Sequence, residues 1–424
     1  MKEPLEGIVV VEMTIAVQGP AAGLYLRDMG AEVIKVEPPL GAASRYSRGR
    51  GNELPEGNMG PQFVAVNRGK RSVCLDVTQT EGLAALHALL AGADVFYTNY
   101  RREALAKLAL DYDSLKAKYP NLIYGAVNGF GPLGQDADKA MLDGAAVARG
   151  GLVNMTGHGN GGPCLPGAIV GDTSGAMHLA LGIMTALLAR ERHGVAQQVQ
   201  TSALGTQLWL QQWELTHVAM TGADLSRDGA HHPIIKGPYG VYATSDGGAI
   251  MLATTMQQED WDAFCSLAEV PELAIDPRLQ TPGQRLGEGL AEADTAEIRA
   301  TLAAAFKRKT ALEWDALLRQ LPEVIWERVR TWQEVLSDPQ SEVNNYIVEI
   351  DVPGYHRTKT VGNLVNLSAT PGSTKGGPPE LGADNVAVLR AAGLNQTTIE
   401  VATEQANARR EEMLAQLLAA REEN

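Results

Sequence analysis

The chain opens with a strand, a helix and a second strand in close succession, and no other feature constrains its fold as strongly. Residues 7–12 have the β-branched sequence GIVVVE, which is typical of a buried strand. A helix is expected over 20–29, with Pro20 in its first turn and Gly30 at its end. The sequence AEVIKVE at 31–37 predicts the second strand. A strand–helix–strand unit brings its strands together in parallel, so we expect a parallel sheet covered by helices.

The same alternation continues to about residue 130. We expect further strands over 72–77, 94–98 and 122–127, and helices over 81–90 and 114–119. Together these elements predict an open, doubly wound α/β layer. Residues 41–60 show no periodicity and are expected to form a long surface loop.

The sequence changes character near residue 222, where turn residues become frequent. Helices are expected before this point, over 172–192 and 202–220. After it we expect a hairpin over 240–255, helices over 258–267, 295–308 and 310–320, a strand over 345–352 and a helix over 397–421. This order predicts a small α+β domain at 222–335, between a large domain at 1–221 and a C-terminal part at 336–424.

Composition excludes several classes of protein. The chain has 36 Lys and Arg against 50 Asp and Glu, a formal charge of −14, so we do not expect nucleic acid as its main partner. Cys74, Cys164 and Cys265 are far apart and form no CxxC pair, which argues against a structural zinc site. There is neither a signal-peptide pattern nor an apolar run of about 18 residues, so we expect a cytoplasmic protein without membrane association.

Asp172 is the strongest candidate for chemistry. It lies where an extended apolar stretch meets the long predicted helix, with Gly171 before it and Gly175 after it. The backbone N–H groups and the dipole of a first helical turn favour an ionised carboxylate there, which could act as a nucleophile. The alternative is that Asp172 only caps the helix, which is the more common role of an Asp at such a position.

The segment GDTSGAMH at 171–178, followed by a long helix and Arg-x-x-x-Gly, resembles the class III CoA-transferases of the formyl-CoA transferase and carnitine CoA-transferase type. The resemblance covers nearly the whole chain. Its other motifs follow in the family's order: Asn67–Ser72 with Leu75-Asp76, Thr98–Tyr100, Asn128–Gly131, Trp261 with Asp276–Arg278, Asp338–Gln340, Ser368–Pro371 and Gly377–Gly382.

This resemblance implies an architecture and a reaction. The large domain is expected to be Rossmann-like and built from both chain ends, with the smaller domain inserted, and two chains are expected to interlock as a dimer. Asp172 corresponds to the nucleophile. It is expected to form an acyl-aspartyl anhydride and then an aspartyl-CoA thioester, so that CoA moves from an acyl-CoA donor to a carboxylic acid. Coenzyme A is then a substrate, and neither a metal nor a nicotinamide is expected.

The resemblance also indicates the surrounding residues. Gln18 and Asp143 are expected near the nucleophile, and Gly247 and Gly248 are candidates for oxyanion donors, with a plain hairpin turn as the alternative. The expected contacts to CoA are Lys70, Arg71, Asn99, Tyr100, Arg101 and Lys107, with Arg102 as a further cation; each charged one could instead be a solvated surface group. Pro38 stands where many relatives have Arg, so CoA could be held instead by Arg45 or Arg48.

Three other interpretations remain open at this point. An NAD(P) oxidoreductase would need G-x-G-x-x-G where residues 15–23 have IAVQGPAAG. A 2-methylacyl-CoA racemase would need His where Leu142 stands, and His178 is expected to be buried and hydrogen-bonded. A non-catalytic CoA-binding subunit of a heteromer would not need Asp172.

The acceptor has no comparable signature. Met141, Leu142, Val153 and Met155 are apolar and suit an acceptor with a hydrocarbon or aromatic part. Succinyl-CoA with an aryl- or alkyl-succinate, as in the benzylsuccinate CoA-transferases, is one hypothesis; formate, oxalate, carnitine-type and mesaconate-type acceptors are others.

Overall fold

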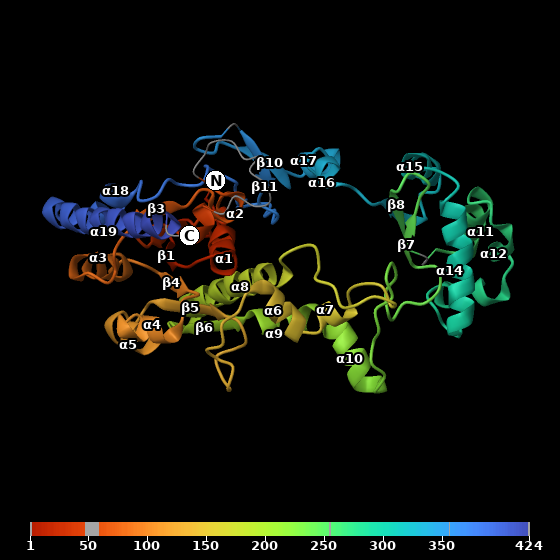
Figure 1. The fold of residues 1–424 in the computed structure, drawn as a ribbon, viewed down its shortest axis with the longest axis horizontal. Coiled ribbons are helices and arrows are strands. Elements are labelled where there is room, and N and C mark those ends of the chain that lie inside the picture. The colour runs from red at the N-terminus through yellow and green to blue at the C-terminus, as the bar shows by residue number, and fades with distance from the viewer. Residues whose placement is uncertain (1, 47–58, 254–255, 356, 423–424) are drawn as a thin grey trace. The chain divides into compact units, whose positions relative to one another are not determined.

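The computed structural model of the chain describes residues 2–46, 59–253, 256–355 and 357–422, and it divides into two compact units (Figure 1). The first unit contains Met1–Gly150, Ala168–Leu210 and Leu336–Asn424. The second contains Gly151–Gly167 and Gln211–Val335. Both chain ends therefore contribute to the first unit. The division differs from the expected boundary at residue 222, because residues 211–221 and the segment 151–167 group with the second unit.

The first unit is built on a six-stranded parallel sheet with the strand order β3-β2-β1-β4-β5-β6. Its strands are β1 Val9–Met13, β2 Glu32–Glu37, β3 Arg71–Cys74, β4 Val95–Thr98, β5 Ile123–Asn128 and β6 Gln198–Ser202. Residue Val10 of β1 pairs with Val33 on one side and with Val95 on the other, so β1 and β4 lie where the order reverses. This is the doubly wound order of Rossmann-like folds, and it confirms the predicted parallel sheet.

Helices cover both faces of this sheet. The helices of the first unit are α1 Gln18–Asp28, α2 Pro61–Asn67, α3 Thr80–Ala91, α4 Arg102–Lys107, α5 Tyr112–Lys118, α6 Asp143–Arg149, α8 Val170–His193, α9 Ala203–Leu210, α17 Pro339–Val343, α18 Asn385–Ala391 and α19 Gln396–Glu422, with a 3-10 turn η1 at Ala43–Arg45. The strands β10 Ile347–Ile350 and β11 Thr358–Val361 pair separately as an antiparallel hairpin.

Alternation along the strands assigns each side chain to one of two cores. Val10 packs in the core that contains α1 and α8, whereas Val11 packs in the opposite core with Leu86 of α3. Near the end of the chain, Leu389 of α18 and Ile399 of α19 complete that second core, and Figure 1 shows both helices beside the first part of the chain. The C-terminal segment therefore belongs to the sheet domain.

Three features of this part of the chain differ from what the sequence indicated. Residues 198–202 form the edge strand β6, which the sequence did not indicate because QVQTS has a single apolar residue. The helix expected over 202–220 is two helices, α9 and α10 Gln212–Thr221. Asp172 is also not a capping residue, because α8 begins at Val170 and the N-cap is Ile169.

The second unit has a three-stranded antiparallel sheet, β7 Gly240–Ala243, β8 Ala249–Ala253 and β9 Ile325–Arg328, in the order β7-β8-β9. The predicted hairpin is confirmed, and β9 is an addition to it. Buried aromatic residues, among them Trp261, Phe264, Phe306 and Trp314, fill its core. Its helices are α7 Leu152–Met155, α10, α11 Gln258–Leu267, α12 Pro271–Ala274, α13 Pro282–Arg285, α14 Glu292–Phe306, α15 Ala311–Leu318 and α16 Trp332–Val335, with a 3-10 turn η2 at Pro277–Leu279.

Candidate active site

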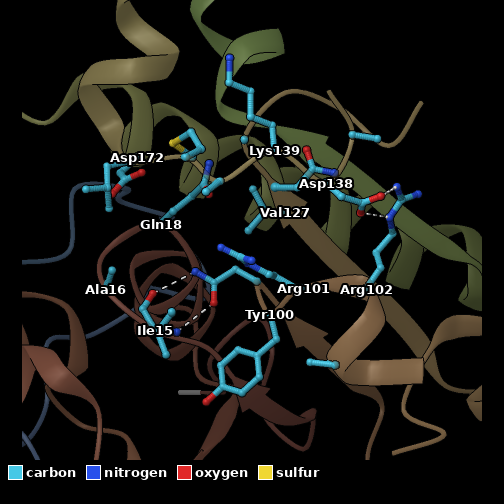
Figure 2. A pocket seen from close by; sticks show the side chains of 18 residues that line it. Ile15, Ala16, Gln18, Tyr100, Arg101, Arg102, Val127, Asp138, Lys139 and Asp172 are labelled. Carbon is cyan, nitrogen blue, oxygen red and sulfur yellow. Dashed lines mark hydrogen bonds and ion pairs between the residues drawn. The ribbon is translucent and has the colours of Figure 1, made fainter. Parts of the chain in front are cut away.

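A cavity of about 570 Å³ lies in the first unit, at the carboxyl ends of strands β1, β4 and β5 (Figure 2). In doubly wound sheets this edge, where the strand order reverses, is the usual place for a ligand. The walls are the loops that follow the three strands, the segment before α6 and the first turn of α8. The lining residues are Ile15, Ala16, Gln18, Asn99–Arg102, Ala104, Val127–Gly129, Ala137–Leu142 and Asp172.

Asp172 contributes a carboxylate to this cavity. It lies in the first turn of α8 and is partly buried, and within the described part of the chain its carboxylate accepts no hydrogen bond. Burial and, secondly, the charge of Asp143 raise the pKa of Asp172 to about 6. Desolvation and a like charge therefore outweigh the helix dipole, which by itself would favour the ionised carboxylate. At neutral pH the group is still mostly ionised.

Asp143 is the first residue of α6 and holds the first turn of α8, which carries Asp172. Its Oδ1 accepts a hydrogen bond of 2.9 Å from the backbone N–H of Asp172. A Cβ atom at Gly171 would lie 2.9 Å from the same oxygen and 3.2 Å from Val147, so the close approach of α6 and α8 requires glycine there. The structure thus brings together Asp143 and Asp172, as the sequence predicted.

Gln18 supplies a polar donor beside this carboxylate. It is the first residue of α1 and is buried, and its Nε2 donates no hydrogen bond to any described residue. The amide lies against Gly175, in the turn of α8 that follows Asp172, and a Cβ at Gly175 would overlap it. Figure 2 shows Gln18 and Asp172 on the same side of the cavity. A buried donor without a partner has unmet hydrogen-bonding capacity that a ligand oxygen can satisfy.

Asn99, Tyr100 and Arg101, which the family resemblance gave as CoA contacts, follow β4 and line the cavity. The amide of Asn99 is occupied, because it accepts a hydrogen bond from the Ile15 N–H (2.9 Å) and donates one to the Ile15 carbonyl (2.9 Å). Burial raises the pKa of Tyr100 to about 12. The guanidinium of Arg101 has no ion-pair or hydrogen-bond partner among the described residues, and it extends across the middle of the view in Figure 2.

Arg102 and Lys139 are the other cations of the cavity wall. Arg102 forms a bidentate ion pair with Asp138, at 2.8 and 2.7 Å, which ties the 130–142 loop to α4. Lys139 has no carboxylate partner in the described ranges, and its Nζ lies 5.4 Å from the centroid of the Phe130 ring. The sequence interpretation did not single out Lys139, although it lies close in the sequence to Leu142 and Asp143, which were considered.

Three expected CoA contacts lie away from the cavity. The Lys70 amine is completely buried and donates to Glu12 (2.7 Å), Asn67 (3.0 Å) and the Pro20 carbonyl (2.7 Å), so no donor remains for a phosphate. Arg71 is paired with Glu32 and Asp384. Lys107, at the end of α4, is exposed and is not among the lining residues.

The alternative cations in the 41–60 loop do not reach the cavity wall in the described part of the chain. Arg45 is buried in a bidentate ion pair with Glu37, at 2.7 and 2.6 Å, and its guanidinium lies over the Phe63 ring. Arg48 lies outside the described residues.

Gly247 and Gly248 form the turn between β7 and β8 in the second unit. The N–H of Gly247 donates to the Thr244 carbonyl (3.4 Å), and that of Gly248 donates to Asp246 Oδ1 (3.2 Å). Because both donors are used within the turn, the structure favours the plain hairpin and gives no separate support to an oxyanion role. Val153 likewise belongs to the second unit, as does Met155, and neither lines the cavity.

The fold and the cavity together define an α/β enzyme of the doubly wound class, with a partly buried carboxylate at the ligand-binding edge of its sheet. Residues 5–385 match the family described as CoA-transferase family III, and the chain belongs to this family. It is a CoA-transferase, which moves CoA between an acyl-CoA and a carboxylate. The resemblance found in the sequence is thereby confirmed, and the oxidoreductase interpretation is excluded.

Characterised relatives span almost the whole chain. It is 31% identical to the succinate–glutarate CoA-transferase of Agrobacterium fabrum, over 92% of this chain and 95% of that protein. It is 30% identical to the succinyl-CoA:mesaconate CoA-transferase of Haloarcula marismortui, over 94% and 98%. The crystal structure of a CAIB/BAIF family protein from Brucella suis matches with a TM-score of 0.81 and 28% identity, over 92% of this chain and all of that one.

The described ranges hold neither a membrane-spanning helix nor a group of metal ligands. None of the helices there is both long and apolar enough to cross a bilayer. No group of three or more His, Cys, Asp or Glu side chains is placed to hold a metal ion in the same ranges.

Proposed function

We propose that the chain transfers CoA through covalent intermediates on Asp172. The carboxylate attacks the thioester carbonyl of the donor, the C–S bond breaks, and an acyl-aspartyl anhydride and CoA thiolate result. The thiolate then attacks the aspartyl carbonyl, which releases the donor carboxylate and forms an aspartyl-CoA thioester. The acceptor carboxylate displaces the thiolate to form a second anhydride, and the thiolate finally attacks the acceptor carbonyl. Acceptor-CoA leaves and Asp172 is regenerated.

One observation carries this proposal: the carboxylate of Asp172 lines the cavity and accepts no hydrogen bond from a described residue, near the Gln18 Nε2, which has no partner among those residues. Each step develops negative charge on a carbonyl oxygen, and a pre-placed N–H donor stabilises such an oxyanion. We assign that donor role to Gln18. Asp143 positions the nucleophile through its hydrogen bond to the Asp172 N–H.

The cations of the cavity are proposed to bind the anionic parts of the substrates. Arg101 is unpaired among the described residues and Lys139 has no carboxylate partner there, whereas Arg102 is neutralised by Asp138. We propose that Arg101 contacts a phosphate of CoA, and that Asn99 and Tyr100 shape the wall against which CoA lies. An arginine is suited to this role because its planar fork matches phosphate geometry.

For the substrates we propose succinyl-CoA as donor and a short dicarboxylate as acceptor. The names of the relatives from Agrobacterium and Haloarcula support succinyl and dicarboxylate substrates. Ile15, Val127, Met141 and Leu142 add apolar surface to the same cavity. This surface favours an acceptor with hydrocarbon substituents, so alkyl- and aryl-succinates, benzylsuccinate included, belong in the first screen.

We further propose an interlocked homodimer that acts in the cytoplasm. Large apolar side chains are exposed along α8 and α9, next to the open edge strand β6: Met177, Leu181, Leu188, Trp209 and Leu210. An exposed apolar surface of this kind beside an unpaired sheet edge is typical of an interface. Native mass spectrometry of the purified chain would show a dimer, whereas a monomer that dimerises only with a second, similar chain would indicate a heteromer.

The test of the covalent mechanism is intact-mass measurement and peptide mapping after incubation with succinyl-CoA and trapping with hydroxylamine. We expect a hydroxamate on the peptide that contains Asp172, and none in an Asp172→Asn variant that still binds CoA. Absence of any adduct from the wild-type chain with several acyl-CoAs, while CoA still binds, would refute the covalent mechanism and favour the racemase-like or non-catalytic interpretation.

A further inference from the structure

A cluster of charged side chains lies beneath the loop that carries Gln18. It consists of Glu12 at the end of β1, Lys35 in β2 and Lys70 directly before β3, and all three side chains are 0% exposed. Burial of three charges is costly, and pairs of this kind can often be replaced by apolar residues without loss of stability. The presence of the cluster therefore suggests a role other than stability, and its hydrogen bonds indicate what that role is.

Glu12 is the centre of the cluster. Its Oε1 accepts hydrogen bonds from Lys35 Nζ (2.8 Å) and Thr14 Oγ1 (2.7 Å). Its Oε2 accepts bonds from Lys70 Nζ (2.7 Å) and the Tyr97 hydroxyl. Although burial alone would raise the pKa of Glu12, the charges of Lys35 and Lys70 lower it to about 2, so this carboxylate is ionised at every physiological pH.

The two lysines connect this centre to both ends of the loop. Lys35 Nζ donates a second bond to the carbonyl of Thr14 (3.1 Å), and Lys70 Nζ donates one to the carbonyl of Pro20 (2.7 Å). Thr14 and Pro20 flank the segment 15–19, whose only polar side chain is Gln18. The cluster therefore holds the chain at both ends of the segment that carries Gln18.

The segment itself would not keep its shape unaided. Ala16 has a φ of 59°, in the left-handed region that a residue with a Cβ atom rarely adopts and that persists only where the surroundings hold it. From the cavity side, Asn99 holds both backbone groups of Ile15. From below, the Glu12 cluster holds the two carbonyls that flank it, and Val17 packs in the core formed with α1 and α8.

We propose that Glu12, Lys35 and Lys70 are positioning residues for transfer, which hold the 14–20 segment so that the Gln18 amide stays aimed at the carbonyl on Asp172. The inference rests on the proposed role of Gln18. It predicts that loosening the cluster lowers kcat through Gln18 and leaves the affinity for acyl-CoA nearly unchanged.

The test is a double-mutant cycle between Lys35→Met and Gln18→Ala. Methionine keeps the length of the lysine and leaves Glu12 and Lys70 as a neutral pair, so the variant should fold. We expect Lys35→Met to lower kcat about tenfold in the wild-type chain, with KM for acyl-CoA changed by less than about twofold. In the Gln18→Ala background, Lys35→Met should lower kcat by less than about twofold, because the effects of substituting residues that act as a unit are not additive.

A matched control is Asp28→Asn, which weakens a second buried ion pair at the other end of α1, between Asp28 and Arg68. It should lower the melting temperature without a coupling to Gln18. If Lys35→Met lowers kcat by the same factor with and without Gln18, or changes only KM, the proposal is wrong. Should Lys35→Met not fold, Thr14→Val removes one bond to Glu12 and completes the same cycle.

Hydrogen–deuterium exchange separates this inference from the proposed mechanism. Amides of residues 14–19 should exchange faster in Lys35→Met than in Asp28→Asn at equal global stability. If the amides exchange faster in Lys35→Met but the wild-type protein transfers no CoA, the positioning role is upheld and the proposed mechanism is overturned. Unchanged exchange in an active enzyme would overturn the positioning alone.

Discussion

Replacing Asp143 with asparagine should make the enzyme active at lower pH. The proposed nucleophile, Asp172, has to be ionised, and its pKa is raised from 3.8 to about 6, first by burial and then by the charge of Asp143. Asparagine keeps an oxygen that can accept the 2.9 Å bond from the Asp172 N–H, while the negative charge is removed. The variant therefore isolates the electrostatic contribution from the positioning contribution.

The size of the effect follows from the order of the two causes. The whole shift is about two pH units, and burial accounts for the larger part, so the charge of Asp143 accounts for at most about one unit. With a pKa near 6, about 10% of Asp172 is ionised at pH 5; with a pKa near 5, about half is. The ratio of kcat/KM in Asp143→Asn to kcat/KM in the wild type should thus be up to about fivefold higher at pH 5 than at pH 8.

The assay is kcat/KM for the acyl-CoA donor from pH 4.5 to 8.5, because this ratio reports the ionisation of the free enzyme. Asp113→Asn, an equal charge change at an exposed position in α5 that does not line the cavity, serves as control. The acid limb should move down in Asp143→Asn and stay in place in Asp113→Asn. An unmoved or upward-shifted limb in Asp143→Asn would show that like-charge repulsion does not set the pKa of Asp172.

Other substitutions test the remaining parts of the site. Because the pKa of Asp172 is raised in the folded chain, its ionised form destabilises the fold; this cost is full above about pH 6 and absent below about pH 4. Asp172→Asn should therefore raise the free energy of unfolding by about 1–2 kcal/mol at pH 8, after allowance for solvent screening, and leave it unchanged at pH 4. Urea titrations at the two pH values measure the difference. Arg101→Met should raise KM for acyl-CoA about tenfold with little change in kcat; an unchanged KM would remove Arg101 from the CoA site. Gly175→Ala should displace the Gln18 amide and lower kcat at least tenfold, with no further loss when Gln18→Ala is added.

The elements with strong periodicity could be predicted from the sequence, because local patterning alone specifies them. The first two strands and the helix between them were placed within a few residues, as was the long helix that carries Asp172. Strand β6 was missed because local patterning does not specify it. It is stabilised by backbone pairing with β5, from Tyr124–Gln198 to Asn128–Ser202, and its own sequence has no strand pattern.

In the site, the sequence indicated Asp172, Gln18 and Asp143, because these residues lie within or beside recognisable motifs. It did not distinguish free cations from paired ones. Lys70 and Arg101 look equally able to bind a phosphate, yet Lys70 is enclosed by Glu12, 58 positions earlier, while Arg101 meets no partner among the described residues.

By itself, then, the sequence determined the type and order of most helices and strands and the family, and it indicated Asp172 as the candidate nucleophile, since each of these is specified by neighbouring residues. Only the tertiary structure decided which charges are available and how acidic Asp172 is. Those properties depend on groups that the fold brings together from distant positions, such as Asn99 against Ile15 and Asp143 against Asp172. Burial and ion pairing depend on spatial neighbours, and a linear motif does not contain them.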